Sequence, residues 1–114
     1  MIDIDTAHGM EFSMDDKEMY QEIVQIFIDQ KADNVASIMD FFEKQDWENY
    51  KIRVHGLKSN ARLVGAMQLG DFAEKCEHAA RDGDTAFIQA HTDELFALYE
   101  QSLDALKKID FAAL

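Results

Sequence analysis

The sequence has no proline, only one cysteine, Cys76, and only five glycines in 114 residues. A single cysteine excludes an internal disulfide and is typical of a reducing compartment. No apolar run approaches the roughly 18 residues that a membrane-spanning helix needs. Residues 1–12 carry acids where a secretory signal carries basic residues. These absences predict a soluble, cytoplasmic protein.

Basic residues are also scarce, because 11 Lys and Arg stand against 23 Asp and Glu, for a formal net charge of −12. Such a surface repels polyanions, which argues against binding of nucleic acid and against docking on anionic lipid. For most of the acids, solubility is a sufficient explanation. The length fits a single domain over residues 1–114, with one hydrophobic core.

The apolar residues recur at helical spacing, and no stretch alternates for long as a strand does. Ser13, with Asp16 three residues later, predicts the start of a helix that runs to about residue 44, with a bend near residues 29–31. Three more helices are predicted: one from an N-cap at Asp46 to Gly65, one over residues 66–81 and one over residues 85–108. The turn at residues 82–84 separates the last two, and a short helical turn over residues 3–8, closed by Gly9, precedes them all.

Each of these last three segments carries one apolar stripe, which neighbouring helices must cover. Short connections make sequential helices antiparallel neighbours. The predicted fold class is therefore all-α, an antiparallel four-helix bundle with a short extra N-terminal helical segment. The stripes consist of Trp47, Tyr50, Val54, Leu57, Ala61 and Val64, then Leu69, Phe72, Ala73, Cys76 and Ala80, then Ile88, Leu95, Leu98, Leu106 and Ile109.

Residues 23–28 break the amphipathic pattern, because apolar groups lie nearly all round the helix there. Either this helix is covered on several sides, or part of it forms an exposed patch for a partner. Coverage is the favoured interpretation, and the partner patch stays open. The apolar residues are Ile23, Val24, Ile26, Phe27 and Ile28.

The segment around His55 differs from the rest of this acidic chain. Residues 49–70 contain no acid, although the overall acid content predicts about four in such a window. The same window holds basic residues on both sides of the histidine: Lys51, Arg53, Lys58 and Arg62. The sequence thus predicts one locally positive surface with a histidine within it.

Helical geometry places Lys51, His55, Lys58, Ser59 and Arg62 on one strip, beside the buried stripe. His55 is therefore expected to be exposed. Its neighbours Gly56 and Ser59 are small, and a glycine inside a helix costs about 1 kcal/mol relative to alanine. Low bulk beside an exposed imidazole is useful if the active site of another protein must reach the ring.

The residue types indicate phosphoryl chemistry. A neutral imidazole is a nucleophile near neutral pH and forms covalent intermediates. A phosphoryl group on the ring brings a charge of about −1.5 to −2, which Lys58, one turn along, can offset. Phosphoryl transfer also needs a metal ion and an in-line donor or acceptor. The chain has no Gly-rich phosphate loop, so a partner must supply that machinery.

The stretch His55-Gly56-Leu57-Lys58-Ser59, with Gly65 ten residues after the histidine, resembles the signature of the histidine phosphotransfer (HPt) domains of bacterial phosphorelays. The resemblance extends to the Leu69, Ala73 and Glu77 spacing, the turn at residues 83–84 and the closing amphipathic helix. It implies a four-helix bundle whose exposed histidine exchanges phosphoryl groups with the aspartate of a receiver domain. His55 would be the phosphoacceptor and Lys58 its electrostatic partner.

Ser59 stands where the family usually has glycine, and serine is still small enough for access. Glu77 corresponds in spacing to a glutamate that hydrogen-bonds the phosphoacceptor ring in the related domain of chemotaxis kinases. An ordinary surface carboxylate is the alternative for Glu77.

The resemblance predicts a phosphoryl carrier that is not an enzyme and binds no cofactor or metal itself, since Mg²⁺ belongs in the partner receiver. Its partners would be the receiver domain of a response regulator or of a hybrid histidine kinase, and it would act as a monomer. Met1 and the lack of a flanking linker favour a free-standing protein. The alternative function is a non-phosphorylated docking module that regulates a receiver or kinase. His8 and His78 are expected at the surface, and His91 at the core boundary.

Overall fold

The computed structural model describes residues 2–114, which form six α-helices, one 3-10 turn and no strand. The helices are α1 (Thr6–Phe12), α2 (Lys17–Asp29), α3 (Lys31–Glu43), α4 (Trp47–Leu63), α5 (Met67–Asp82) and α6 (Thr85–Lys107), and the 3-10 turn is η1 (Phe111–Ala113).

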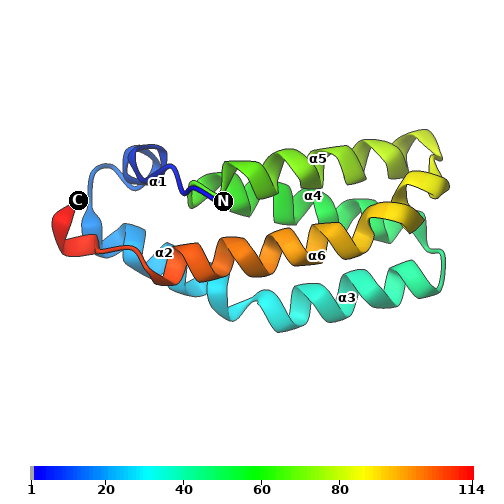
Figure 1. Cartoon of the computed structure of the whole chain (residues 1–114), viewed down its shortest axis with the longest axis horizontal. Coiled ribbons are helices and arrows are strands. Elements are labelled where there is room, and N and C mark those ends of the chain that lie inside the picture. The colour runs from blue at the N-terminus through cyan, green and yellow to red at the C-terminus, as the bar shows by residue number, and fades with distance from the viewer. Residues whose placement is uncertain (1) are drawn as a thin grey trace.

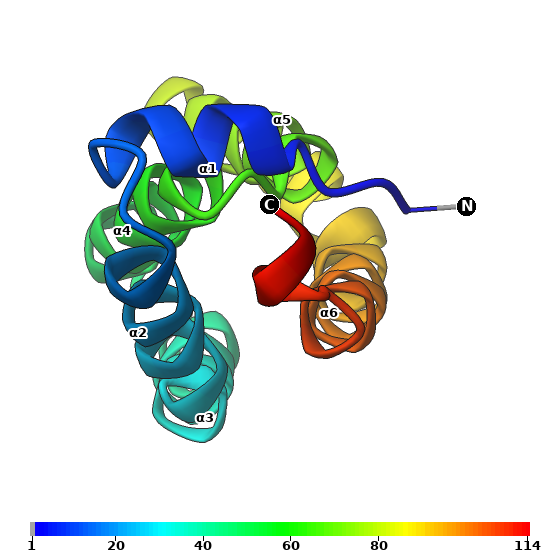
Figure 2. The same cartoon turned by 90° about the vertical axis from the view of Figure 1, so that its left-hand side faces the viewer.

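The helices form an elongated bundle in which α2 and α3 follow one another along one edge (Figure 1). Helices α4, α5 and α6 then run back and forth along the same axis. Figure 2 shows α1 lying across one end of this bundle. Counting α2 and α3 as one rod, the predicted four-helix bundle with a short extra N-terminal segment is confirmed. None of the helices in residues 2–114 is long and apolar enough to cross a membrane.

Three tyrosines lie fully buried in the core, and each satisfies its hydroxyl group internally. Tyr20 donates to the Val64 carbonyl at 2.8 Å. Tyr50 shares a hydrogen bond of 2.9 Å with Thr92, and Tyr99 accepts one of 3.1 Å from Asn34. These bonds link residues at least 42 positions apart and remove the penalty of burying a polar atom.

Aspartates begin three of the long helices by accepting hydrogen bonds from the first turn. Asp16 accepts from the amide of Glu18, and Asp46 and Asp84 accept from amides three residues ahead. At the turn between α5 and α6, Gly83 has a φ of 74°, the left-handed conformation that ends a helix. The predicted N-cap at Asp46 and the turn at residues 82–84 are confirmed.

The prediction that Ser13 starts the first long helix is wrong. Ser13 is the C-cap of α1 and is buried, and its hydroxyl has no hydrogen-bond partner within residues 2–114. Met14 and Asp15 then adopt left-handed conformations, which end the helical path before Asp16 starts α2. The expected bend near residues 29–31 is confirmed, because α2 ends and α3 begins on either side of Gln30.

The short N-terminal helical turn is present as α1, but its predicted bounds of residues 3–8 are wrong, because Gly9 lies inside α1 and does not end it. A Cβ atom at Gly9 would lie 2.4 Å from the ring of Tyr20. Close packing of α1 on α2 therefore explains this glycine better than helix termination does.

Residues 23–28 are covered only in part, and a partner at their exposed side stays a prediction. Val24 and Phe27 are buried in the core, whereas Ile26 is 56% exposed. The helix is therefore covered on one side and presents apolar surface on another.

Gly65 fixes the position of the N-terminal segment against the end of α4. Its carbonyl accepts a hydrogen bond of 2.8 Å from the Asp5 amide. A Cβ at Gly65 would lie 2.3 Å from the Asp5 carbonyl oxygen, and its φ of 89° suits only glycine. By contrast, a Cβ at Gly56 would meet nothing within 4 Å.

These two glycines give opposite expectations for the same substitution. Gly65→Ala should lower the free energy of unfolding by about 2 kcal/mol or more, because the backbone strain adds to the overlap with Asp5. Gly56→Ala should raise it by about 1 kcal/mol, since alanine favours the helix. Urea unfolding of both variants checks this, and equal effects would contradict the role assigned to Gly65.

Candidate functional site

His55 lies near the middle of α4, on the side that faces away from the core. Val54 and Leu57 on the same helix are buried, which turns the imidazole outward. Its side chain is 57% exposed. The expectation of an accessible histidine beside the core stripe is confirmed.

Glu77 of α5 reaches across to α4 and contacts two of the predicted site residues with its two carboxylate oxygens. Oε2 forms a hydrogen bond with Nδ1 of His55, and Oε1 accepts one of 2.6 Å from Nζ of Lys58. The side chains of Lys58 and Glu77 are only 14% and 15% exposed. The structure thus joins His55, Lys58 and Glu77 into one cluster, termed here the His55–Glu77–Lys58 cluster.

This contact determines which ring nitrogen of His55 carries the hydrogen. An ionised carboxylate only accepts hydrogen bonds, so in the neutral ring Nδ1 must be the donor to Glu77. The other nitrogen, Nε2, then holds a lone pair. The cluster therefore prepares Nε2 of His55 as a nucleophile.

The electrostatic surroundings keep Glu77 ionised. Burial by itself raises the pKa of the Glu77 carboxyl. The hydrogen bonds and positive charge that Lys58 and His55 provide outweigh this effect and hold that pKa below its ordinary value.

The two remaining cations of the strip, Lys51 and Arg62, are also paired. Arg62 donates to Asp71 at 3.1 Å and to Glu74 at 2.8 Å. Lys51 lies 3.4 Å from Glu48 on its own helix. Three of the four cations of the predicted positive surface are therefore paired, two of them with acids of α5.

This pairing between α4 and α5 is not among the predictions made from the sequence, although the spacing of the charged residues indicates it. Asp71, Glu74 and Glu77 recur every three residues and so share one face of α5. Lys58 and Arg62, four residues apart, share one face of α4. Two helices joined by a short turn bring such faces together.

Gly56 and Ser59 lie close to His55 along α4 without entering the cluster. Gly56 is half-buried and leaves open space where a side chain would be. Ser59 is exposed. Both leave little side-chain bulk around the imidazole, as the sequence predicts. Their part in any reaction stays a prediction.

Two pockets along α4, on the side of α2 and α3, share Gln30 and Asn60 in their linings and are together termed here the groove. Its first part is lined by Gly56, the residue that follows His55, and not by His55 itself, and its second part is largely apolar. Ile52 and Ile26 at its walls are 57% and 56% exposed. The first part is lined by Gln30, Asp33, Asn34, Ala36, Ser37, Ile52, Arg53, Gly56, Leu57 and Asn60, and the second by Ile23, Ile26, Phe27, Gln30, Asn60, Leu63 and Val64.

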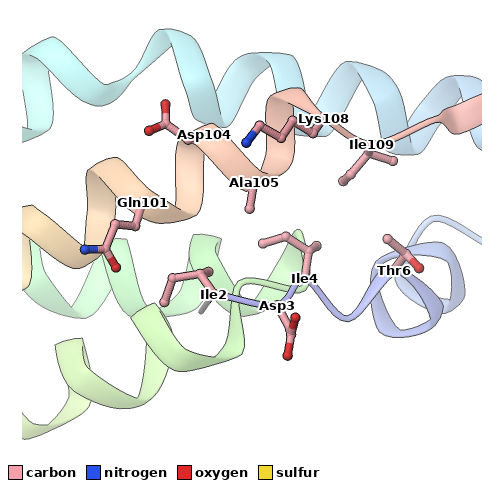
Figure 3. A pocket seen from close by; sticks show the side chains of 9 residues that line it. All are labelled: Ile2, Asp3, Ile4, Thr6, Gln101, Asp104, Ala105, Lys108 and Ile109. Atoms are coloured by element: carbon pink, nitrogen blue, oxygen red, sulfur yellow. The ribbon is translucent and has the colours of Figure 1, made fainter.

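A separate open pocket lies between the N-terminal segment and the end of α6 (Figure 3). Its lining includes Ile4, Asp104 and Lys108, and none of the predicted site residues. Within residues 2–114, no group of three or more His, Cys, Asp or Glu side chains is arranged to hold a metal ion.

The other histidines differ from His55 in their surroundings. Nδ1 of His91 bonds Glu94 at 2.9 Å, and its ring lies 4.4 Å from that of Phe87. The side chain of His78 is 45% exposed, with a carboxylate oxygen of Glu74 at 3.8 Å. Neither has a lysine joined to the same carboxylate among the described residues.

Comparison with known families gives one match. The model of the Hpt domain family matches residues 22–109, which include the whole His55–Glu77–Lys58 cluster. Searches among curated proteins and among solved structures found no match.

The lowered pKa of Glu77 predicts how the stability of the protein depends on pH. The ionised carboxylate stabilises the fold above its ordinary pKa of 4.5, and this contribution is lost as the pH falls through the lowered value. Glu77→Gln removes the titrating group. The difference in free energy of unfolding between the wild-type protein and this variant should therefore shrink as the pH falls below 4.5. Urea titrations across this range measure it, and a difference independent of pH would contradict the pairing.

Proposed function

This chain belongs to the Hpt domain family, and we propose that it carries a phosphoryl group on Nε2 of His55, in exchange with the aspartate of a receiver domain. Hpt domains have a phosphotransfer role in phosphorelays, interact with receiver domains and are phosphocarrier modules rather than kinases. The His55–Glu77–Lys58 cluster is the observation that supports His55 as the carrier in this chain.

The proposed reaction needs no proton transfer. The lone pair of Nε2 attacks the phosphorus of an aspartyl phosphate, the bond between phosphorus and the carboxyl oxygen breaks, and the aspartate recovers its carboxylate. Nδ1 keeps its hydrogen, so the ring becomes cationic. Glu77 favours this outcome because it binds Nδ1 through that hydrogen. The reverse step returns the phosphoryl group to an aspartate.

The remaining requirements are met by Lys58 and by the partner. Lys58, one turn from His55, can offset the charge of about −2 that the phosphoryl group brings. The receiver supplies the aspartate and Mg²⁺, which stabilises charge on the transferred group. In this proposal the chain acts as a cytoplasmic monomer, is not an enzyme and binds no cofactor of its own.

Substitution of the histidine tests the proposal directly. A phosphorylated receiver domain with Mg²⁺ should label the wild-type protein in an acid-labile, base-stable form, and His55→Gln should abolish labelling without loss of helix content. His91→Gln is the matched control, because its Nδ1 also bonds a carboxylate. Labelling of the His55 variant would falsify the assignment.

The same experiment separates the alternative function. If the wild-type protein binds the receiver but takes up no label, the chain is a non-phosphorylated docking module. If only His55→Gln fails to take up label, the phosphoryl carrier is supported.

The groove beside His55 is where we place the receiver. Gly56 lines this groove and follows His55 in sequence, so a partner that reaches the ring also covers its walls. The exposed side chains of Ile52 and Ile26 provide apolar surface that a receiver would bury, and Arg53 provides a positive charge for an acidic partner.

An acidic substitution at Ile52 tests this placement. Ile52→Asp should slow transfer from the receiver by about fivefold or more, because a charge would be buried in the interface. Met14→Asp is the control, since Met14 is 83% exposed and does not line the groove. Rapid-quench kinetics measure both variants, and equal transfer rates would place the receiver elsewhere.

A further inference from the structure

We infer that Lys58 exchanges partners during each phosphorylation cycle, from Glu77 in the unphosphorylated protein to the phosphoryl group on His55 in the phosphorylated one. Glu77 thereby limits how strongly Lys58 stabilises phosphohistidine. This inference rests on the proposed function and concerns the regulation of the same site.

The cations of the strip nearest to His55 are already paired. Lys58 is bound to Glu77 at 2.6 Å, Lys51 lies 3.4 Å from Glu48, and Arg62 holds two acids. A phosphoryl group that arrives on Nε2 therefore gains a cation from the strip only by taking it from a carboxylate.

Lys58 is the cation of the strip that can move to the phosphoryl group. Lys58 lies one turn from His55, has a single carboxylate partner and carries its charge on a flexible stem. Arg62 lies a further turn away and is fixed by both Asp71 and Glu74. Its stem also packs over Gly70, where a Cβ would lie 2.7 Å from its Cγ.

Glu77 can release Lys58 without becoming an uncompensated, nearly buried charge. When it attacks, the ring of His55 is neutral because Nε2 must hold a lone pair, and Lys58 is then the cation that faces Glu77. After transfer the ring keeps its hydrogen on Nδ1 and is cationic, so Oε2 of Glu77 then contacts a positive charge. The new charge on the ring replaces the one that leaves with Lys58.

The stabilisation of phosphohistidine by Lys58 therefore depends on the attraction between Lys58 and Glu77. In the wild-type protein, the benefit of Lys58 to phosphohistidine is its attraction to the phosphoryl group minus its attraction to Glu77. Without the Glu77 carboxylate nothing is subtracted, so Lys58 should stabilise phosphohistidine more strongly. The effect of Lys58 on the phosphorylation equilibrium therefore depends on residue 77.

A double-mutant cycle measures this dependence. The equilibrium constant for phosphoryl exchange with one receiver domain is determined for the wild-type protein, Lys58→Met, Glu77→Gln and the double variant. Lys58→Met should lower the amount of phosphohistidine by a factor about two to five times larger in the Glu77→Gln background than in the wild type, as a partly covered ion pair implies. Repeating the cycle with Glu74→Gln should give no such difference, because Glu74 bonds Arg62.

An equal or smaller effect of Lys58→Met in the Glu77→Gln background would overturn the exchange. A role of Glu77 in holding the histidine tautomer alone would alter labelling of both Glu77→Gln variants equally, and so would not produce the difference. Failure of the proposed function is distinct, since the wild-type protein itself would then take up no label.

A second measurement does not depend on the receiver. Phosphoramidate can phosphorylate histidine as its P–N bond breaks and ammonia leaves. Urea unfolding of the four proteins should show coupling between residues 58 and 77 before this treatment. After it the coupling should be lost, whereas coupling of the same size in both states would contradict the exchange.

Discussion

The packing of α4 against α5 is the constraint on which the site depends. Small buried residues lie along this contact, with Ala61 on α4 and Ala73 and Cys76 on α5, so the two helices approach closely. Gly70 leaves room for the stem of Arg62 at the same contact. The close approach brings Glu77 within hydrogen-bonding distance of both His55 and Lys58.

The fold separates stability from reactivity. The core is formed by apolar stripes that face inward. Its three buried tyrosines form hydrogen bonds with residues of other helices or of the turn after α4. His55 lies on the opposite side of α4, so its chemistry can be altered without opening the core. Gly56, which weakens the helix by about 1 kcal/mol relative to alanine, is accommodated because the buried stripe holds α4 in place.

Charge is organised between helices rather than within them. The window without acids on α4 meets the acids of α5, which pair with Lys58 and Arg62, two of the four cations in that window. The long-range electrostatic attraction of this surface for an acidic partner is therefore reduced near His55. In the proposed complex, recognition of the receiver rests more on the apolar groove than on net charge.

The sequence by itself determined the four long helical segments, the cap at Asp46, the turn at residues 82–84, the exposure of His55 and the family resemblance, because periodicity, capping and local motifs act over a few neighbouring residues. It misplaced Ser13 and Gly9, whose roles depend on the left-handed turn after α1 and on the ring of Tyr20. Only the tertiary structure decided that Glu77 bonds both His55 and Lys58 and that Arg62 is neutralised. Those contacts join side chains 9 to 22 residues apart on two helices, and their geometry is set by how closely the helices pack.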